Sequence, residues 1–464
     1  MPSASVLHTH GFWKKVFGFA IPIALQNLSV ALFGIIDVSI ISNMGEVAVS
    51  AVSLANEVFY VASLITFGIT SGTSVLLSRY YGAGNRGEFK KNFAAMLVMC
   101  TVINTLVMLL SFVVPGQLLA LYTDEKVLME AGAIYLIITA PMNVCYGIAN
   151  SISTFFRSVH KPSVPLMVSL ATVIVKTGLN VVFIYGMGPI PEMGVAGAAI
   201  ATLLAKILEL VLYILFLLRF KDKEYCFRWR DIRGLNKNML GPYLKEIAPV
   251  ILNESLWGLG VSSFNMIFGR MGLAAVSAVS VARKLENLCN AFFYGIGIGS
   301  CVTISSMLGE NKKEEAKLAA KRYAVVGFEA GILIMLLMLG CNHIYVDTFF
   351  KDLTAETCTV TKILITIYAL YMPFRSLAST LIMGVLRAGG DSKHAMYYDV
   401  IPVFVWALPI GFVLGIVLKL PIGIVLAAMQ FKRVIKCGFA LRRMLSGKWL
   451  RMQEFETIKE ERIK

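Results

Sequence analysis

The sequence predicts an all-α membrane protein, with twelve transmembrane helices in two pseudo-symmetric six-helix lobes that are parallel repeats. Three observations predict this fold. The 464 residues are 57% hydrophobic and only 15% charged, whereas a soluble domain carries about 25% charged residues. The apolar residues form long blocks that suit bilayer-spanning helices. The second half of the chain also repeats the pattern of the first.

The apolar blocks define twelve expected spans, and short polar or basic stretches separate them. They cover residues 16–41, 47–77, 92–122, 128–156, 163–186, 194–218, 245–269, 274–307, 322–346, 359–386, 395–418 and 421–444. The last span is the weakest, because Lys432, Arg433 and Lys436 interrupt its apolar run. An even number of spans returns the C-terminal tail to the side of the membrane on which the N-terminus lies.

Basic residues gather in alternate loops between the spans. Lys14, Arg79, Arg157, Lys312 and Arg387 are examples, and the other loops are nearly free of lysine and arginine. This is the positive-inside pattern, which predicts that both termini are cytoplasmic. The net charge of +15 therefore reflects topology and does not indicate a nucleic-acid partner. We expect a multi-pass protein of the plasma (cytoplasmic) membrane whose basic loops contact anionic lipid headgroups.

A shift of 227 residues aligns the two halves of the chain. It places Met44–Ala55 (MGEVAVSAVSLA) on Met271–Ala282 (MGLAAVSAVSVA), and farther along it pairs glycine with glycine. Six spans separate the copies, so both halves have the same orientation in the membrane. Transporters built from such halves bind substrate between them, near the membrane midplane.

The repeat also predicts how the chain divides into domains. Residues 1–219 are expected to form an N-terminal lobe with the first six spans, and residues 243–449 a C-terminal lobe with the last six. Residues 220–242 are polar and basic and lack a spanning run, which indicates a cytoplasmic linker. Residues 450–464 form a cytoplasmic tail.

Several functional classes lack their sequence signatures. The eight cysteines show no CxxC or metal-type spacing, so no metal site or disulfide framework is expected. The chain has no GxxxxGK[ST], GxSxG or HExxH motif, which argues against ATP hydrolysis and enzyme activity. We expect no cofactor other than a coupling ion. The sequence is silent on the oligomeric state, for which a monomer is the expectation.

Three segments resemble sequences of the MATE family (multidrug and toxic compound extrusion). The most specific is Thr177–Lys206 (TGLNVVFIYGMGPIPEMGVAGAAIATLLAK), and Leu386–Lys393 (LRAGGDSK) and Arg442–Trp449 (RRMLSGKW) follow in the family's order. The resemblance implies export of cationic or amphipathic compounds, such as drugs, in exchange for inward H⁺ or Na⁺. The alternative is a flippase for lipid-linked precursors from the same superfamily, a class that tends to have cavities rich in arginine and lysine.

Asp37 lies alone among apolar residues in the first span (ALFGIIDVSIIS). A charge at the centre of a spanning helix costs roughly 2.5–3.5 kcal/mol, so this carboxyl is expected to change between its neutral and ionised forms as a coupling group. The alternative is an aspartate that only satisfies a neighbouring helix. The resemblance implies the coupling role for Asp37, and a cation- or proton-binding role for Asn180. Lys176 lies one helical turn before Asn180. It is expected either to pair with Asp37 or to reach the lipid headgroups.

Glu254 lies within the seventh span and is similar in placement to an acid with which one MATE branch binds Na⁺. That branch also has an acid in the tenth span, where this chain has Arg375 and no acid. The difference favours H⁺ over Na⁺. Four further charged residues lie at apparent membrane depth: Lys284, Glu286, Arg375 and Asp399. Because intramembrane charges usually pair, Glu254 is expected to join them in a buried network that is either structural or a second coupling site.

Six aromatic and methionine side chains are candidates for a substrate cavity, because such side chains suit organic cations and varied shapes. They are Trp257, Tyr146, Phe293, Tyr294, Met266 and Met383. Ordinary helix packing is the alternative for each of them. Glu57, in the second span, is expected either to cap the outer end of its helix or to join the Asp37 network.

Overall fold

The computed structural model is helical throughout the spans that it describes. The described part comprises residues 9–42, 44–187, 190–220, 222, 224–225, 231–232, 235, 237–349 and 355–451. No strand occurs in these ranges, as expected for an all-α membrane protein. Within them, seven helices are each long and apolar enough to cross a membrane, and two bent pairs of helices bring the number to nine.

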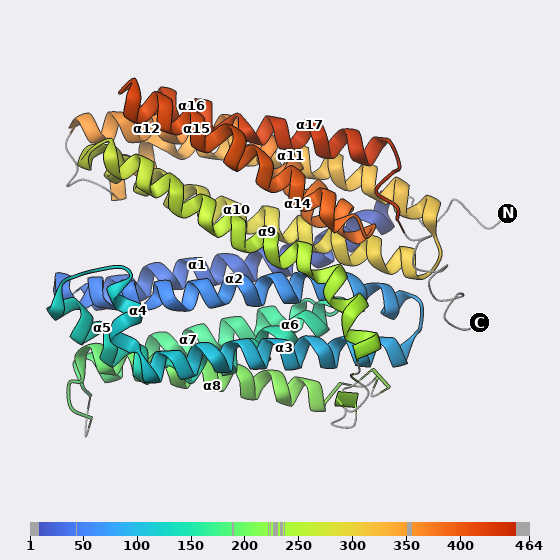
Figure 1. The fold of residues 1–464 in the computed structure, drawn as a ribbon, viewed down its shortest axis with the longest axis horizontal. Coiled ribbons are helices and arrows are strands. Elements are labelled where there is room, and N and C mark those ends of the chain that lie inside the picture. The colour runs from blue at the N-terminus through green and yellow to red at the C-terminus, as the bar shows by residue number, and fades with distance from the viewer. Residues whose placement is uncertain are drawn as a thin grey trace. The chain divides into compact units, whose positions relative to one another are not determined.

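Each predicted span corresponds to one helix or to consecutive helical segments (Figure 1). The first six are α1 (Thr9–Ser42), α2 (Glu46–Gly82), α3 (Arg86–Val113) with α4 (Pro115–Ala120), α5 (Lys126–Thr139) with α6 (Met142–Ser158), α7 (Ser163–Tyr185) and α8 (Gly194–Leu218). The seventh, eighth and ninth spans are α9 (Lys237–Arg270), α10 (Leu273–Gly309) and α11 (Lys313–Phe349). The tenth consists of α12 (Ala355–Leu370), α13 (Met372–Ser379) and η3 (Thr380–Leu386), and the eleventh of α14 (Ser392–Ile401), η4 (Pro402–Ala407), α15 (Leu408–Phe412) and η5 (Val413–Val417). The twelfth consists of α16 (Ile422–Gln430) and α17 (Lys432–Leu445).

One span in each half of the chain is bent near its middle. α5 and α6 meet at 49°, and α12 meets α13 with η3 at 45°. Pro141 precedes α6, and Pro373 lies in the first turn of α13. Proline has no backbone N–H and disturbs the preceding turn, so a helix bends or ends where it occurs. The repeat seen in the sequence is therefore also present in the shape of the spans.

The chain folds into two compact units that differ from the predicted lobes. Unit 2 comprises Leu25–Ile251, and unit 1 comprises Met1–Ala24 together with Leu252–Lys464. The first helical half of α1 thus belongs with the later part of the chain, and the first helical half of α9 belongs with the earlier part. The predicted boundaries instead keep α1 whole in the N-terminal lobe and place α9 in the linker and the C-terminal lobe.

Glycines at matched positions of the repeat permit this exchange. A Cβ at Gly68 on α2 would lie 2.7 Å from Ile251 Cα in unit 2. One at Gly295 on α10 would lie 2.6 Å from the Ala20 carbonyl oxygen in unit 1. Because a side chain at either position would meet backbone, only glycine lets the helices approach this closely.

Aromatic side chains fill part of the core of unit 2. The Phe155 ring centroid lies 5.6 Å from that of Phe89 and 5.4 Å from that of Phe220, and Tyr225 packs edge-on against Phe89 at 5.2 Å. Phe220 and Tyr225 belong to the predicted linker, yet both are buried. α9 also begins within that segment. The described part of the segment is thus anchored to unit 2.

The segments Leu386–Lys393 and Arg442–Trp449 contact each other in unit 1. The buried carboxylate of Asp391 accepts a hydrogen bond from Arg443 Nε at 2.7 Å and pairs with Arg451 Nε at 3.0 Å. The Trp449 indole covers Gly389 so closely that no Cβ fits there. The contact ties the end of α17, and the first residues of the predicted tail, to the loop after η3.

Candidate functional site

Unit 2 contains a cavity of about 330 Å³. α1 contributes Val30, Gly34 and Ile41 to its wall, and α7 contributes Lys176 and Asn180. Asn180 is 1% exposed. The structure therefore brings together two of the predicted coupling residues, one helical turn apart on α7.

Asp37 lies on α1, and its side chain is outside the described residues. The predicted pair between Asp37 and Lys176 stays a prediction for that reason. Glu57, on α2, is exposed and does not belong to the described wall of the cavity.

Polar side chains from α2, α7 and α8 form much of the remaining wall. The uncharged ones are Ser53, Asn56, Ser169, Thr172 and Thr202. On α8, Lys206 Nζ donates a hydrogen bond to Glu209 Oε2 at 2.7 Å. Lys206 Nζ also lies 5.5 Å from the ring centroid of Tyr146, which is itself not among the described wall residues. Hydroxyl and amide groups thus lie among apolar side chains at this wall, together with one lysine–glutamate pair.

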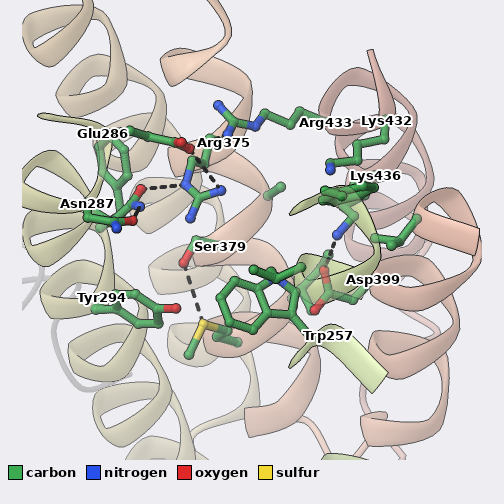
Figure 2. A pocket seen from close by; sticks show the side chains of 18 of the residues that line it. Trp257, Glu286, Asn287, Tyr294, Arg375, Ser379, Asp399, Lys432, Arg433 and Lys436 are labelled. Carbon is green, nitrogen blue, oxygen red and sulfur yellow. Dashed lines mark hydrogen bonds and ion pairs between the residues drawn. The ribbon is translucent and has the colours of Figure 1, made fainter. Parts of the chain in front are cut away.

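Unit 1 contains a second cavity, of about 160 Å³, which is drawn in Figure 2. Four of the predicted substrate residues line it: Trp257, Phe293, Tyr294 and Met383. Met266 is 66% exposed and does not belong to the described wall. Further aromatic rings at the wall belong to Phe264, Phe268 and Tyr368.

Acidic and basic side chains pair across this second cavity (Figure 2). Glu286 Oε1 accepts a hydrogen bond from Arg433 Nη2 and lies 3.5 Å from Arg375 Nη1. Arg375 Nε in turn donates to Asn290 Oδ1 at 2.5 Å. One carboxylate from α10 therefore holds an arginine from α13 and another from α17.

Two more carboxylates at the wall have their own basic partners. Asp399 pairs with Lys436 Nζ at 2.5 Å and accepts a hydrogen bond from Asn253 Nδ2 at 3.1 Å. Glu254 Oε1 accepts from Arg387 Nη2 at 2.8 Å. The predicted network thus contains Glu254, Glu286, Arg375 and Asp399 around one cavity. Lys284 is exposed on α10 and does not belong to the described wall.

The interpretation of Arg79, Arg157 and Arg387 as loop charges is wrong, because all three lie in helical segments and are at least partly buried. Arg387 is 1% exposed, and Arg157 Nη2 donates to Gln26 Oε1 at 2.7 Å. The repeat contained a signal for this, since the register that aligns the later parts of the two halves pairs these two arginines. A shared position in both halves favours a shared structural role.

The three bases of the weak twelfth span are also buried. Lys432, Arg433 and Lys436 are 9%, 4% and 7% exposed, and all three line the cavity from α17 (Figure 2). Lys436 follows Lys432 by four positions and Arg433 by three, and residues so spaced share one face of a helix, which is the signal that sequence reasoning missed. No group of three or more His, Cys, Asp and Glu side chains that could hold a metal ion occurs in the described part of the chain.

Comparisons with known proteins agree over both halves of the chain. The family model MatE matches residues 22–185 and 249–428. The chain is 24% identical to "Probable multidrug resistance protein NorM" of Thermotoga maritima, over 97% of this chain and 95% of that protein. It is also 24% identical to "Multidrug and toxin extrusion protein 1" of Oryctolagus cuniculus, over 92% of this chain and 75% of that protein.

Solved structures share the fold at lower identity. The crystal structure of a mutant of the Vibrio cholerae MATE transporter VcmN aligns with a TM-score of 0.86 at 17% identity, over 95% of this chain and 97% of that one. The eukaryotic MATE transporter AtDTX14 aligns with a TM-score of 0.80 at 16% identity, over 95% and 96% of the two chains. The twelve-span, two-lobe fold class is confirmed.

Proposed function

Because this chain belongs to the MatE family, we propose that it is a secondary active exporter of small cationic or amphipathic compounds, driven by inward H⁺ or Na⁺. The relatives named as multidrug resistance and extrusion proteins support this class of transport. The parallel repeat supports alternating access, in which the two halves rock about a substrate site.

The cavity in unit 2 is the observation that carries the proposal. It holds Lys176 and Asn180 among hydroxyl and amide groups, so an ion that enters it finds oxygen ligands in an apolar surrounding. Position 37 on α1 is three residues after Gly34 and four before Ile41, both of which line the cavity. Residues spaced by three and four share one face of a helix, and this spacing favours Asp37 as the coupling carboxyl.

The chemistry of coupling follows from the charge of one carboxyl group. A carboxylate in low dielectric is stabilised by a bound cation or by protonation, and it is costly when neither is present. An inward H⁺ or Na⁺ neutralises Asp37, and the organic compound competes for the same site when the cavity faces the cytoplasm. When the carboxylate is ionised, the Lys176 ammonium group is its proposed partner.

The surroundings of the protein follow from the same proposal. The basic loops favour a multi-pass protein in the plasma membrane with cytoplasmic termini and anionic lipid as a neighbour. The tenth span carries Arg375 where a family-type Na⁺ site needs an acid, which favours H⁺ as the coupling ion. We propose a monomer.

The test measures efflux of ethidium from cells that express wild type or Asp37→Asn at matched levels, with pH and Na⁺ gradients imposed separately. Wild-type efflux is expected to follow one of the two gradients, and the variant is expected to lose at least 90% of that dependence. Glu57→Gln is the matched control, because it removes an exposed acid from the neighbouring span and is expected to leave efflux unchanged.

Two outcomes would overturn parts of the proposal. Efflux by Asp37→Asn at the wild-type rate, with the same gradient dependence, would assign coupling elsewhere. If neither protein moves ethidium under any gradient, the flippase alternative is the next to test, since the basic residues around the cavity in unit 1 suit the pyrophosphate of a lipid-linked precursor.

A further inference from the structure

The cavity in unit 1 is lined by more basic than acidic side chains. Five basic side chains line it, against three acidic ones: Arg283, Arg375, Lys432, Arg433 and Lys436, against Glu254, Glu286 and Asp399. Each acid already has at least one basic partner. The partner of Glu254 is Arg387, a base additional to the five. Cationic groups therefore remain after all the acids of the wall are paired.

Lys432 is one base without an acidic partner. It is 9% exposed, and none of the ion pairs among the described residues includes it. Its Nζ lies instead 3.7 Å from the ring centroid of Phe264. A cation–π contact offsets only part of the cost of taking an ammonium group out of water. The charged form of Lys432 thus has no acid at the wall to balance it.

Arg433, the next residue, has donors without acceptors. It is 4% exposed, and its Nη2 donates to Glu286. Its Nε and Nη1 are buried and have no hydrogen-bond partner among the described residues. Buried N–H groups in proteins are nearly always paired. The unpaired donors and the unbalanced ammonium group lie on consecutive residues at the wall of one cavity (Figure 2).

We infer that the cavity in unit 1 binds the oxyanion of an amphipathic organic compound, with Lys432 and Arg433 as its principal ligands. A carboxylate, sulfonate or phosphate oxygen is a counter-ion for Lys432 and a hydrogen-bond acceptor for the unpaired donors of Arg433. The aromatic rings of Trp257, Phe264 and Tyr368 at the same wall suit an apolar or aromatic body.

The size of the cavity supports an organic anion over a small inorganic one. Its volume is about 160 Å³, roughly ten times the ~10–15 Å³ that a single water requires. The anion has two sources, a compound in solution or the headgroup of a membrane lipid. Transport of such an anion rests on the proposed function, whereas binding of the anion to this cavity does not. Binding is therefore the quantity to test.

The test uses isothermal titration calorimetry on the purified full-length chain in phosphatidylcholine nanodiscs. The probes are 2-naphthoate and its neutral amide, 2-naphthamide, which have the same body and differ in charge. Lys432→Gln removes the unpaired base, and Arg442→Gln is the matched control, because Arg442 is an exposed base on the same helix. Naphthoate is expected to bind at least tenfold more weakly to Lys432→Gln and equally well to Arg442→Gln and wild type.

Two results would overturn the inference: equal binding of naphthoate to Lys432→Gln and wild type, or binding of naphthamide as tight as that of naphthoate. A misfolded variant is recognised by its melting temperature, which is expected to stay at or above that of the wild type, since Lys432 has no ion pair to lose. If Lys432→Gln does melt lower, Lys432→Arg is titrated in its place, because it keeps the charge. This rescue variant is expected to retain naphthoate binding. Loss of binding by Lys432→Arg would contradict the assignment.

A second arm identifies the source of the anion. Nanodiscs with 30% phosphatidylglycerol weaken naphthoate binding if the headgroup occupies the cavity, and they leave it unchanged if the ligand comes from solution. Both outcomes support an oxyanion site. Because no gradient and no transport enter these measurements, a failure of the efflux test leaves this result standing, and a failure here leaves ethidium efflux untouched.

Discussion

The two units bear cavities of different chemistry on one repeated plan. In unit 2, hydroxyl and amide groups lie among apolar side chains at the wall, and Lys206 has an acid three residues later, Glu209, within 2.7 Å. In unit 1, the wall carries five bases and three acids, and Lys432 has further bases one and four residues later. The repeated fold therefore has a cavity in each unit, and the charged side chains at the two walls differ.

The two units also differ in how they bind the arginines that the repeat aligns, Arg157 and Arg387. Arg157 donates to the neutral amide of Gln26 at 2.7 Å, and Arg387 donates to the carboxylate of Glu254 at 2.8 Å. One unit holds its arginine with a hydrogen bond, and the other holds it with a buried ion pair. The comparison predicts unequal costs when the acceptors are removed.

The largest effect is expected for Glu254→Ala. Breaking a buried ion pair leaves the other charge uncompensated and costs about 3–5 kcal/mol, and Arg387 has a 2% exposed side chain. Gln26→Ala is the matched variant in unit 2 and is expected to cost about 1.5–3 kcal/mol, the range for a hydrogen bond to a charged group. The free energy of unfolding in detergent, followed by tryptophan fluorescence, measures both, and equal losses would contradict the comparison.

Replacing the interhelical glycines is expected to have a smaller effect that is the same in both units. In Gly68→Ala and Gly295→Ala the new Cβ would lie 2.7 Å and 2.6 Å from backbone atoms, and such overpacking typically costs about 1–3 kcal/mol. Melting temperatures of the two variants are expected to fall by similar amounts. Gly269→Ala is the control, because a Cβ there meets no atom within 4 Å. A fall in one unit alone would show that the repeated contact has lost its role there.

The smallest effect is expected for Glu209→Gln. Its pair with Lys206 lies three residues apart on one helix, with side chains 29% and 19% exposed, and half-exposed pairs contribute up to about 1 kcal/mol. The same unfolding measurement is expected to show a loss of less than about 1 kcal/mol. A loss as large as that of Glu254→Ala would mean that unit 2 depends on buried charge as much as unit 1 does.

The helices of this fold could be predicted from the apolar blocks alone. Each of the twelve predicted spans lies in a helix or consecutive helices, but α2 and α11 continue beyond the predicted ends. Hydropathy locates the part of a helix that is inside hydrocarbon, and a helix with polar ends continues into water without changing that signal. Span position was therefore predictable, and helix length was not.

The charged residues of the second cavity were only partly predictable. Glu254, Glu286 and Asp399 stood out because single acids interrupt apolar runs. Arg387 was hidden, because it directly follows the end of a predicted span, where a base in a loop and a base in a buried pair have the same sequence signature. Lys432 stood out only as an interruption of the last span. Only the three-dimensional contact with Glu254 separates the two meanings.

The division of α1 between the units has a consequence for the order of synthesis. Ala20 leaves the ribosome about 275 residues before Gly295, the residue against which it packs. At roughly 5–20 residues per second, this segment waits about 14 to 55 s for its partner. The first helical half of α1 therefore spends that time without its native contact, and unit 1 closes only after α10 has been made. Translation speed between these two positions therefore sets how long the segment remains without that contact.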